Sequence, residues 1–450
     1  MNASLHFATA LLPGGWASDV RIRIQDGLIA EIEPGVAPGD SERHAVALPG
    51  LPNLHSHAFQ RGMAGLAEVR GHNDDSFWTW REIMYRFVDR LTPGDLAAIA
   101  SQAYAEMLES GFTRVGEFHY LHHDRDGRPF ADPAEMSSAI MGAAEETGIA
   151  LTHLPVFYAH AGFGGSAPGE GQRRFIHDVD GFAKLLDAAR AEAKALPDSV
   201  VGIAPHSLRA VTPEELAALA PLANGAPIHI HIAEQAREVE DCLAWSGARP
   251  VEWLLDHAPV GPQWCLVHAT HMTEAETVAM ARSGAVAGLC PITEANLGDG
   301  LFPAEAYLAE GGAYGVGSDS NVRIDAIEEL RLLEYGQRLA RRGRNLLTAP
   351  GQSTGGALYG AALAGGAQAL GAEAGLRVGA PADIVSLDAA HPSLAARSGD
   401  ALLDGLIFAA GREGADRVWR RGREVVTDGR HIARDAIAAR YRATLAKLLA

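Results

Sequence analysis

The stretch LPGLPNLHSH, residues 48–57, decides the fold that we expect for this chain of 450 residues. It is an apolar run that ends in His55 and His57, and alternate residues of a strand point to the same face, so both imidazoles can reach one ion. Further candidate ligands end later strand-like segments: His231 in PIHIHIAEQ, His268 in WCLVHAT and Asp319 in AYGVGSDSN. Imidazoles and one carboxylate, with room left for water, are typical of a catalytic zinc-type site. The sequence therefore indicates a metal-dependent hydrolase.

A pattern of strand followed by helix repeats through the middle of the chain. We expect strands that end near His57, Tyr120, Phe157, His206, Glu234, Thr270, Pro291 and Ser320. Helix-forming stretches rich in alanine and leucine follow most of them, for example 93–110, 213–222, 274–283 and 324–342. Eight such units predict an α/β fold, a (β/α)8 TIM-like barrel over residues 49–371. A doubly wound open sheet is the alternative; the barrel is preferred because the chemically active residues recur at strand carboxyl ends, where barrel active sites are built.

Both ends of the chain are rich in predicted strands. Val20, Ile22 and Ile24 alternate with polar residues before the Asp26-Gly27 turn, which indicates a hairpin. Residues 1–48 and 372–430 are expected to form one small β-sandwich domain, and residues 431–450 a C-terminal helix over about 433–449. The glycine-rich stretch 351–366 lacks the GxxxxGK[ST] pattern of a phosphate loop, so it predicts a closely packed helix after the last strand.

Composition narrows the range of partners and compartments. The net charge of −18 disfavours nucleic acid and anionic membranes, although local arginines can still attract an anionic small substrate. Apolar runs are too short to span a membrane, and the start of the chain does not resemble a signal peptide. Three scattered cysteines, Cys242, Cys265 and Cys290, argue against a disulfide framework. We expect a cytoplasmic protein.

Each candidate ligand taken alone has an ordinary structural explanation. His229 and His231 alternate on one strand, and we choose His231 as the ligand because it lies nearer the strand end, leaving His229 as a buried structural residue. His268 alone could be a hydrogen-bonded core imidazole, and Asp319 could cap a helix in DSNVRIDAIEEL. Their joint occurrence at successive strand ends favours the metal site. Glu234, three residues after His231, is expected to act in proton transfer.

The segments LPGLPNLHSHAFQRGMAG and IHIHIAEQ, the histidine of WCLVHAT and the motif SDS resemble the amidohydrolase superfamily over essentially the whole chain. Two-metal members carry a carboxylated lysine at the end of the fourth strand, whereas VVGIAPHSLRA has His206 and no lysine. The resemblance therefore implies the mononuclear deaminase-like branch. It implies one divalent ion per subunit, with Zn²⁺ favoured over iron or manganese, and barrels that commonly form homodimers. The roles implied are metal ligation by His55, His57, His231 and Asp319, and catalysis by Glu234, His268 and Asp319.

The segments FWTWREIMYRF, EFHYLHH and GSDSNVRIDAIEELRLLEYGQRL resemble more narrowly the deiminase family that converts N-formimino-L-glutamate and water into N-formyl-L-glutamate and ammonia in histidine degradation. That substrate is a small dianionic amidine, and the guanidinium of arginine suits its two carboxylates. By resemblance, the residues that would bind it are Gln60, Arg81, Tyr120, His206 and Arg209. Each of these residues has an ordinary alternative; Arg81, for example, could be a solvated helix residue, and Tyr120 could be half-buried packing.

Two further hypotheses compete with this assignment. Another mononuclear deaminase, acting on guanine, an aminopyrimidine or a thioadenosine-type nucleoside, would favour aromatic stacking and amide donors over the pair Arg81 and Arg209. A non-catalytic scaffold would need no complete ligand set and would contain no stoichiometric ion. The aromatic segment 77–80 beside Arg81 is expected to form a lid over the substrate, whereas His119, His122 and His123 are expected to take no part in the site.

Overall fold

Two parallel sheets form the centre of the molecule in a computed structural model that describes residues 2–70 and 76–450. One contains β5 to β8 in chain order, with β9 also paired to β7, and the other contains β10 to β13. All of these strand pairs are parallel. The strands are β5 (Leu51–Ser56), β6 (Phe112–His119), β7 (Ala150–Phe157), β8 (Val200–Val201), β9 (Ala204–Pro205), β10 (Ile228–Ile232), β11 (Trp264–His268), β12 (Val286–Leu289) and β13 (Ala313–Val316).

Backbone bridges join these two sheets at both of their edges. Ile203 bridges to Ile228, which connects the segment around β9 to β10. At the other edge Ser56 bridges to Asp319, which connects the first strand of the set to the segment after the last one. Two hydrogen bonds support that second junction: His57 N donates to Asp319 O at 3.0 Å, and Asp319 N donates to His55 O at 2.9 Å. The carboxyl ends of the first and the last strand are therefore held side by side.

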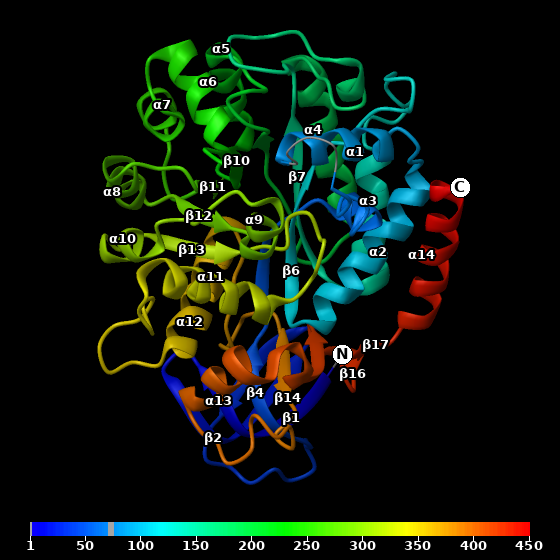
Figure 1. Ribbon diagram of the computed structural model, residues 1–450. Helices are drawn as coiled ribbons and strands as arrows, with labels where there is room; N and C mark the ends of the chain where they lie inside the picture. Colours follow the sequence, from blue (N-terminus) through cyan, green and yellow to red (C-terminus); the bar gives the residue numbers. More distant parts are fainter. Residues whose placement is uncertain (1, 71–75) are drawn as a thin grey trace.

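Helices lie outside the parallel strands and alternate with them along the chain (Figure 1). Hydroxyl caps define several of their starts: Thr92 accepts from Asp95 N and Thr273 from Glu276 N, each in a reciprocal capping box. The four predicted helical stretches are confirmed, with ends that differ by no more than a few residues. The helices of this region are α1 (Phe77–Val88), α2 (Pro93–Glu109), α3 (Glu135–Thr147), α4 (Val179–Ala193), α5 (Pro213–Leu219), α6 (Ala236–Ser246), α7 (Pro250–His257), α8 (Glu274–Ser283), α9 (Pro291–Leu297), α10 (Ala304–Ala309), α11 (Ala326–Arg341) and α12 (Thr354–Ala369).

The glycine-rich stretch forms helix α12, as predicted, and its composition has a packing reason. A Cβ added at Gly365 would lie 1.9 Å from Tyr314 O, and one added at Gly315 would lie 2.8 Å from Gly366 N. Glycine is therefore required on both sides of the contact between α12 and β13, because any side chain would separate the two backbones. Because the two backbones approach so closely, α12 packs directly against β13.

The two ends of the chain meet in one eight-stranded sheet with the order β17-β16-β15-β14-β4-β1-β2-β3. The predicted hairpin at Asp26-Gly27 joins β2 to β3, and both turn residues have positive φ. Phe7, Ile22 and Trp419 belong to the separate hydrophobic core of this sheet. The strands are β1 (Asn2–Leu12), β2 (Gly15–Gln25), β3 (Leu28–Glu33), β4 (Glu42–Pro49), β14 (Ile384–Leu387), β15 (Ala415–Arg420), β16 (Arg423–Thr427) and β17 (Arg430–His431).

The C-terminal helix α14 (Arg434–Leu449) lies along α2, so the predicted helix at this end is confirmed (Figure 1). Lys447 Nζ donates to Asp95 Oδ1 at 2.7 Å, and Arg434 Nη1 donates to Glu109 Oε2 at 2.5 Å. These ion pairs attach α14 to α2, the helix that directly precedes β6. A short helix, α13 (Asp400–Gly405), precedes β15.

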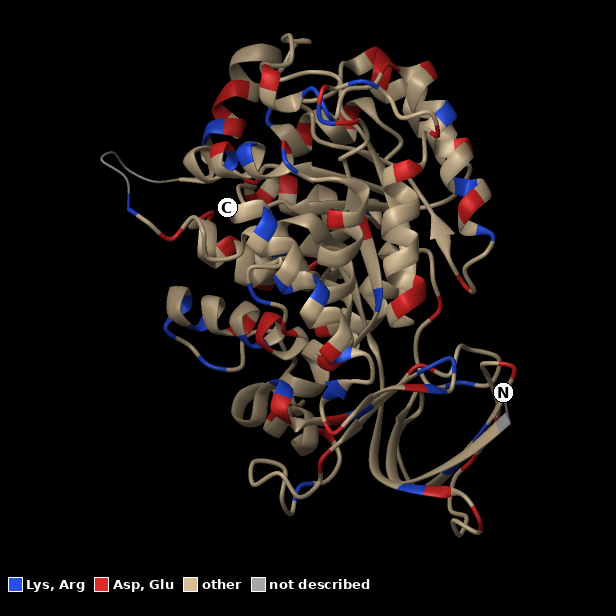
Figure 2. Ribbon diagram, turned by 90° about the vertical axis from the view of Figure 1, so that its right-hand side faces the viewer, with Lys and Arg blue, Asp and Glu red and all other residues tan. Residues whose placement is uncertain are grey.

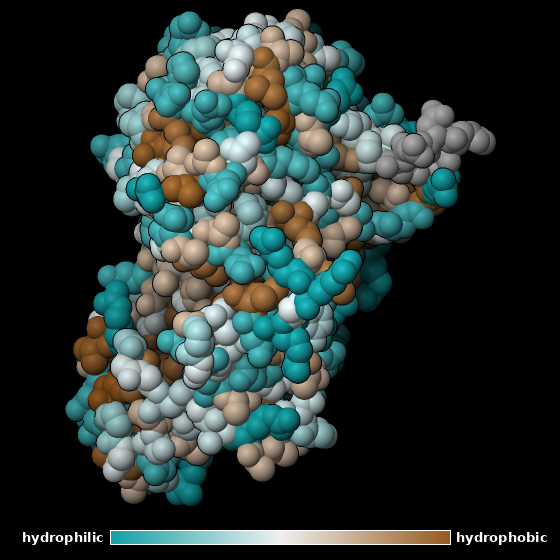
Figure 3. Space-filling view, turned by 60° about the vertical axis from the view of Figure 1, so that its left-hand side comes forward, coloured by the Kyte–Doolittle hydropathy of each residue, from teal (hydrophilic) through white to brown (hydrophobic). Residues whose placement is uncertain are grey.

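The surface carries acidic and basic residues interspersed over the helices and over the eight-stranded sheet (Figure 2). On the face drawn in Figure 3, hydrophobic residues lie in small groups between hydrophilic ones. Within residues 2–70 and 76–450, every helix is too short or too polar to cross a lipid bilayer.

Candidate active site

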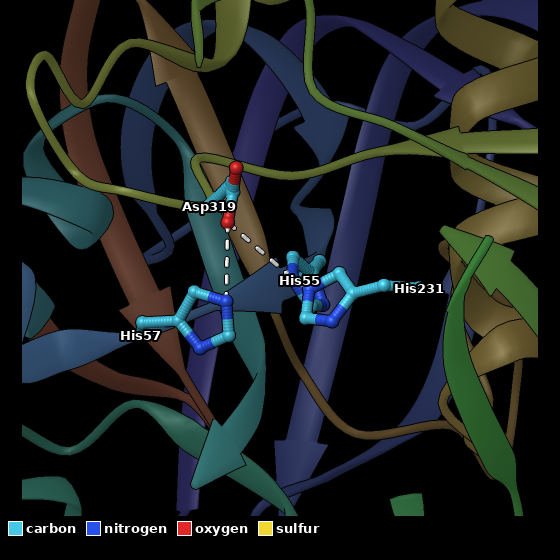
Figure 4. Close-up of side chains that lie close together, drawn as sticks. All are labelled: His55, His57, His231 and Asp319. Carbon is cyan, nitrogen blue, oxygen red and sulfur yellow. Dashed lines mark hydrogen bonds and ion pairs between the residues drawn. The ribbon is translucent and has the colours of Figure 1, made fainter. Parts of the chain in front are cut away.

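Four side chains from three separate strand ends converge on one point (Figure 4). His55 and His57 come from the end of β5, His231 from β10, and Asp319 from the segment after β13. His231 Nε2 lies 3.0 Å from His55 Nε2, and Asp319 Oδ1 lies 3.4 Å from His55 Nε2 and 3.2 Å from His57 Nε2. The structure thus brings together the four residues that the sequence proposes as metal ligands.

The donor set fits one divalent ion. Bonds of about 2.0–2.1 Å at tetrahedral angles place neighbouring donor atoms about 3.3 Å apart, close to the separations seen between these nitrogens and the carboxylate oxygen. Burial lowers the pKa of His55 to about 3, which leaves its imidazole neutral, the form that binds a metal. Burial alone would raise the pKa of Asp319, but the close imidazoles of His55 and His57 outweigh it and hold the pKa of this carboxyl well below its usual range.

Backbone carbonyls accept hydrogen bonds from the Nδ1 atoms of two of these imidazoles. His57 Nδ1 donates to Phe118 O at 2.8 Å, and His231 Nδ1 donates to His206 O at 3.1 Å. A carbonyl can only accept, so both rings carry their proton on Nδ1 and turn a lone pair on Nε2 toward the common point. The neighbouring segments therefore orient both rings so that Nε2 is free to bind a metal ion.

A buried network of polar side chains joins two of the segments that carry the four converging side chains. Asn53 Nδ2 donates to Ser318 Oγ at 2.7 Å, and Ser318 Oγ donates to Asn321 Oδ1 at 2.6 Å. Asn321 Nδ2 donates in turn to His57 O at 3.0 Å. Asn321 and Asp319 both have positive φ, and Asn321 tolerates this conformation well. We call Asn53, Ser318 and Asn321 the seam network, because they connect β5 to the segment after β13.

Asp319 does not cap a helix. Helix α11 begins at Ala326, and its N-cap is Asp325, which accepts from Ile327 N and Glu328 N. The helix expected from residue 324 therefore starts two residues later, and the carboxylate of Asp319 is left to face the three histidines. This removes the alternative explanation that the sequence left open for Asp319.

Glu234 and His268 lie beside the four converging side chains. His268 Nε2 is 3.9 Å from Glu234 Oε1 and 4.0 Å from Asp319 Oδ2. Burial raises the pKa of Glu234, while the positive charges of His268 and Arg209 act in the opposite direction. Burial would lower the pKa of His268, but the negative charge of Glu234 and the hydrogen bond to Glu294 raise it to about 10. Two groups able to carry protons therefore stand next to the candidate metal position.

All five expected substrate residues line one cavity of about 550 Å³ that opens onto this point. Gln60 Nε2 donates to Tyr120 OH at 2.9 Å, so these two are held as a pair on one wall. The cavity is lined by these five residues, Gln60, Arg81, Tyr120, His206 and Arg209, together with His57, His231, Glu234, His268, Asp319 and several aromatic side chains. Tyr120 is buried and lines the cavity.

The two arginines occupy different settings on the cavity wall. Arg209 is buried, 3.7 Å from Glu234 Oε2 and 3.9 Å from Glu238 Oε2, and its Nε and Nη2 have no hydrogen-bond partner among the residues that the structure describes. Arg81, on α1, is half-buried and lies over the ring of Trp78 at 4.6 Å. Buried guanidinium donors that make no hydrogen bond within the protein are suited to bind an anion. Arg81 is a helix residue, as the alternative held, but it faces the cavity.

Several histidines lie away from the cavity. His229 Nε2 donates to Ala369 O at 2.7 Å, so this buried ring anchors α12, in agreement with its expected structural role. His119 ends β6, and His122 and His123 follow it; all three are buried, and none of them lines the cavity. His122 Nε2 donates to Val156 O at 2.9 Å. Strand-end position alone therefore does not place a histidine in the site.

The sequence reasoning missed the carboxylates that follow β12. Glu294 Oε1 lies 3.2 Å from His268 Nδ1, and Asp299 accepts from Gln235 Nε2, next to Glu234. Both belong to PITEANLGDG, which starts at a strand end already expected near Pro291. The position of Glu294, within one helical turn of that strand end, is the signal in the sequence that points to it. Tyr85 and Tyr158 on the cavity wall carried no comparable signal in the sequence.

This chain resembles known proteins over nearly its full length. Residues 46–425 match the model of the amidohydrolase family, and residues 3–45 match the N-terminal domain of formimidoylglutamate deiminase HutF. The chain is 56% identical over 445 residues to formimidoylglutamate deiminase of Pseudomonas aeruginosa, covering 98% of each chain. It is 30% identical to 8-oxoguanine deaminase of the same species, covering 95% of this chain and 94% of that one.

Two solved structures resemble the fold closely. An amidohydrolase from Brucella melitensis superposes with a TM-score of 0.97 at 56% identity and full coverage of both chains. An adenosine deaminase from Xanthomonas campestris, solved with bound zinc, superposes with a TM-score of 0.82 at 23% identity, covering 99% of this chain and 98% of that one. The second likeness concerns the fold alone.

Proposed function

The chain belongs to the amidohydrolase family, and from that membership we propose how its residues carry out the hydrolytic deimination of N-formimino-L-glutamate. The activity is that of a formimidoylglutamate deiminase, a hydrolase acting on a C–N bond in histidine degradation. Water adds to the formimino carbon, the bond from this carbon to the terminal nitrogen breaks, and N-formyl-L-glutamate and ammonia are released. The roles of individual residues are our proposal.

His55, His57, His231 and Asp319 would hold one divalent ion, and we favour Zn²⁺ for a shell of three imidazoles and one carboxylate. An ion bound there would supply Lewis-acid chemistry and make water a better nucleophile at neutral pH. The buried, neutral imidazole of His55 and the outward Nδ1 protons of His57 and His231 support this assignment.

Asp319 and Glu234 would move the protons of the reaction. Asp319 would take a proton from the attacking water, since its carboxyl stays ionised next to the ring nitrogens. Ammonia is a poor leaving group unless its nitrogen is protonated, and Glu234 would deliver that proton. His268, with Nε2 directed toward Glu234 and Asp319, would orient the water and polarise the formimino group.

Arg209 and Arg81 would bind the two carboxylates of the substrate, with Gln60, Tyr120 and His206 as further hydrogen-bonding groups. The observation that carries this assignment is Arg209, which lines the same cavity as His57, His231 and Asp319 and whose buried Nε and Nη2 donate no hydrogen bond to any part of the chain that the structure describes. A buried donor without a partner is costly, and a substrate carboxylate would satisfy it. The aromatic helix α1, which presents Trp80 and Arg81 to the cavity, would act as the lid.

The experiment that tests the proposal measures ammonia release by the purified, zinc-loaded protein. N-formimino-L-glutamate, N-formimino-L-aspartate and guanine are compared at equal concentration. We expect rapid release from the glutamate derivative, slower release from its shorter homologue and none from guanine. Release from guanine alone would favour a ring deaminase and would remove the roles given to Arg81 and Arg209.

At the level of the whole chain we propose one closed (β/α)8 barrel over residues 49–371, supported by the bridges at both sheet edges. Residues 1–48 and 372–430 would form the small β-sandwich domain around their shared sheet. We also propose a cytoplasmic homodimer; the free thiols of Cys242, Cys265 and Cys290 support a reducing compartment. Sedimentation of the purified protein would establish whether two copies associate.

A further inference from the structure

A carboxylate from the segment after β12 contacts the back of His268. Glu294 Oε1 lies 3.2 Å from His268 Nδ1 and accepts the backbone N–H of Cys290 at 2.9 Å. All three residues are buried, with His268 exposed to 1% and Glu294 to 6%. The backbone hydrogen bond fixes the carboxylate at the start of α9, so Glu294 is itself held in place before it meets the imidazole.

The opposite nitrogen of the same ring faces the reaction site. His268 Nε2 is directed toward Glu234 Oε1 and Asp319 Oδ2, and the ring stacks on His231 with a centroid distance of 5.5 Å and an interplanar angle of 10°. The φ of His268 is +68°, a conformation that a histidine rarely adopts. Backbone in that region persists only where the surroundings hold it, so the contact to Glu294 is one of the restraints that keep this ring in place.

We propose that Glu294 is a positioning residue for His268, accepting the Nδ1 proton so that Nε2 stays directed at the reacting group. The proposal rests on the function given above, because it assumes that His268 acts on the substrate and the attacking water. An imidazole whose Nδ1 proton is bound by a carboxylate has a fixed ring plane. Without Glu294, the ring can rotate about its side-chain bonds and turn Nε2 away from the reacting group.

A competing explanation of the same cluster is a second metal site. One ligand atom each from His268, Cys290 and Glu294 lies within 4.8 Å of the others, and a soft divalent ion accepts these ligand types. The two explanations differ in metal content. With positioning, the protein loaded with excess zinc holds one ion per chain; with a second site it holds two, and Cys290→Ser removes one of them.

The kinetic test is a double-mutant cycle between Glu294 and His268. We expect Glu294→Ala to lower kcat about 10- to 100-fold, the usual effect of removing a partner behind an active group, while KM changes only a few-fold. Glu294→Gln keeps an acceptor and should recover part of the loss. In a His268→Asn background the Glu294→Ala change should cost almost nothing further, because the ring that it positions is gone.

The matched control is Glu329→Gln. Glu329 is a second buried carboxylate at the same helix start, where its Oε2 accepts from Ile292 N at 2.9 Å, but it has no contact with His268. Burial raises the pKa of Glu329 well above its usual range, so the neutral amide is a close substitute, and kcat should stay near that of the unaltered enzyme. A similar loss in this variant would assign the Glu294 effect to general disturbance of α9.

A readout independent of turnover comes from ¹⁵N NMR of histidine-labelled protein, with the His268 signals assigned by their loss in His268→Asn. We expect one sharp signal from a hydrogen-bonded Nδ1–H of His268 in the unaltered enzyme, and loss or broadening of that signal in Glu294→Ala. Additive losses in the cycle, an unchanged Nδ1–H signal, or two zinc ions per chain would each overturn the proposal. Absence of ammonia release from N-formimino-L-glutamate by the unaltered enzyme would count against the proposed function, and the NMR measurement would still decide the role of Glu294.

Discussion

Single residues show most clearly what the sequence can and cannot predict. His55 and His57 are two residues apart on one strand, so their shared direction follows from the geometry of a strand. Glu294 escaped prediction because its partner, His268, belongs to another strand end, and the distance between them exists only in the folded chain. A local sequence pattern identifies side chains that lie together on one strand or helix. It does not identify two side chains that meet only when two separate elements pack against each other.

Arg209 provides a direct test of substrate recognition at this scale. We expect Arg209→Met to raise KM for N-formimino-L-glutamate at least 10-fold, because a charged hydrogen bond to a substrate carboxylate is worth about 1.5–3 kcal/mol. Metal content should stay constant, since Arg209 contacts none of the four converging ligands directly. Steady-state kinetics and metal analysis of the same preparation give the measurement.

The control for this change is Arg430→Met. Arg430 is exposed and pairs with Asp435 at the far end of the β-rich sheet. Its replacement should leave KM unaffected. If Arg209→Met behaved like this control on the dianionic substrate, the carboxylate clamp would have to be placed elsewhere.

Elements were predicted better than their contacts. The strand and helix positions in the middle of the chain follow from hydrophobic periodicity and from caps such as Thr92 and Thr273, all of which are local signals. The exact start of α11 could not be predicted, because Asp319 and Asp325 are both plausible caps. In the folded chain, the parallel bridge between Ser56 and Asp319 places Asp319 beside the three converging histidines.

Helix α12 allows a prediction about packing between elements. We expect Gly365→Ala to destabilise the protein by about 1–3 kcal/mol or more, because a methyl group has no room between the helix and β13 and would force backbone shifts. In the same helix, a Cβ at Gly360 meets no atom within 4 Å. Gly360→Ala should therefore stabilise the fold by about 0.5–1 kcal/mol through the better helix propensity of alanine. Denaturant unfolding of both variants gives the comparison, and equal effects would contradict the packing argument.

The seam network leads to a second prediction at the scale of elements. Asn321→Ala removes the hydrogen bonds to Ser56 Oγ and His57 O that hold β5 next to the segment carrying Asp319. We expect metal to be lost to a chelator about 10- to 100-fold faster, the range found when partners behind metal ligands are removed. Asn296→Ala, which removes one exposed hydrogen bond to Glu68, is the control. Equal rates of loss in the two variants would show that the network has no influence on the ligands.

For the whole molecule, buried histidines make stability depend on pH. Burial lowers the pKa of His119 to about 3, so between that value and about 6.5 the unfolded chain binds a proton that the folded chain does not. The contribution of His119 to the free energy of unfolding is therefore complete above about pH 6.5, and it is lost as the pH falls toward the pKa of the folded state. Buried acids act with the opposite sign, since burial raises the pKa of Glu117 to about 7 and that of Asp299 to about 8.

Replacing His119 separates its effect on the pH dependence of stability from the opposite effects of the buried acids. In His119→Phe, the free energy of unfolding should fall less steeply below about pH 6.5 than in the unaltered protein, by up to about 1.4 kcal/mol per pH unit. Denaturant unfolding at several pH values between about 7 and 5 measures the difference. Parallel curves for the two proteins would mean that His119 does not remain neutral in the fold.

The junction between the first and last parallel strands also determines when the site can exist. His55 and Asp319, two of the proposed metal ligands, come from opposite ends of the strand order, and the backbone hydrogen bonds that join His55 and His57 to Asp319 form only after the intervening strands are in place. During synthesis, a ribosome must release the chain beyond residue 321 before the fourth ligand and its seam network can reach the first two. A shorter nascent chain holds only the three histidines, so tight capture of the ion would report that the last strand has docked.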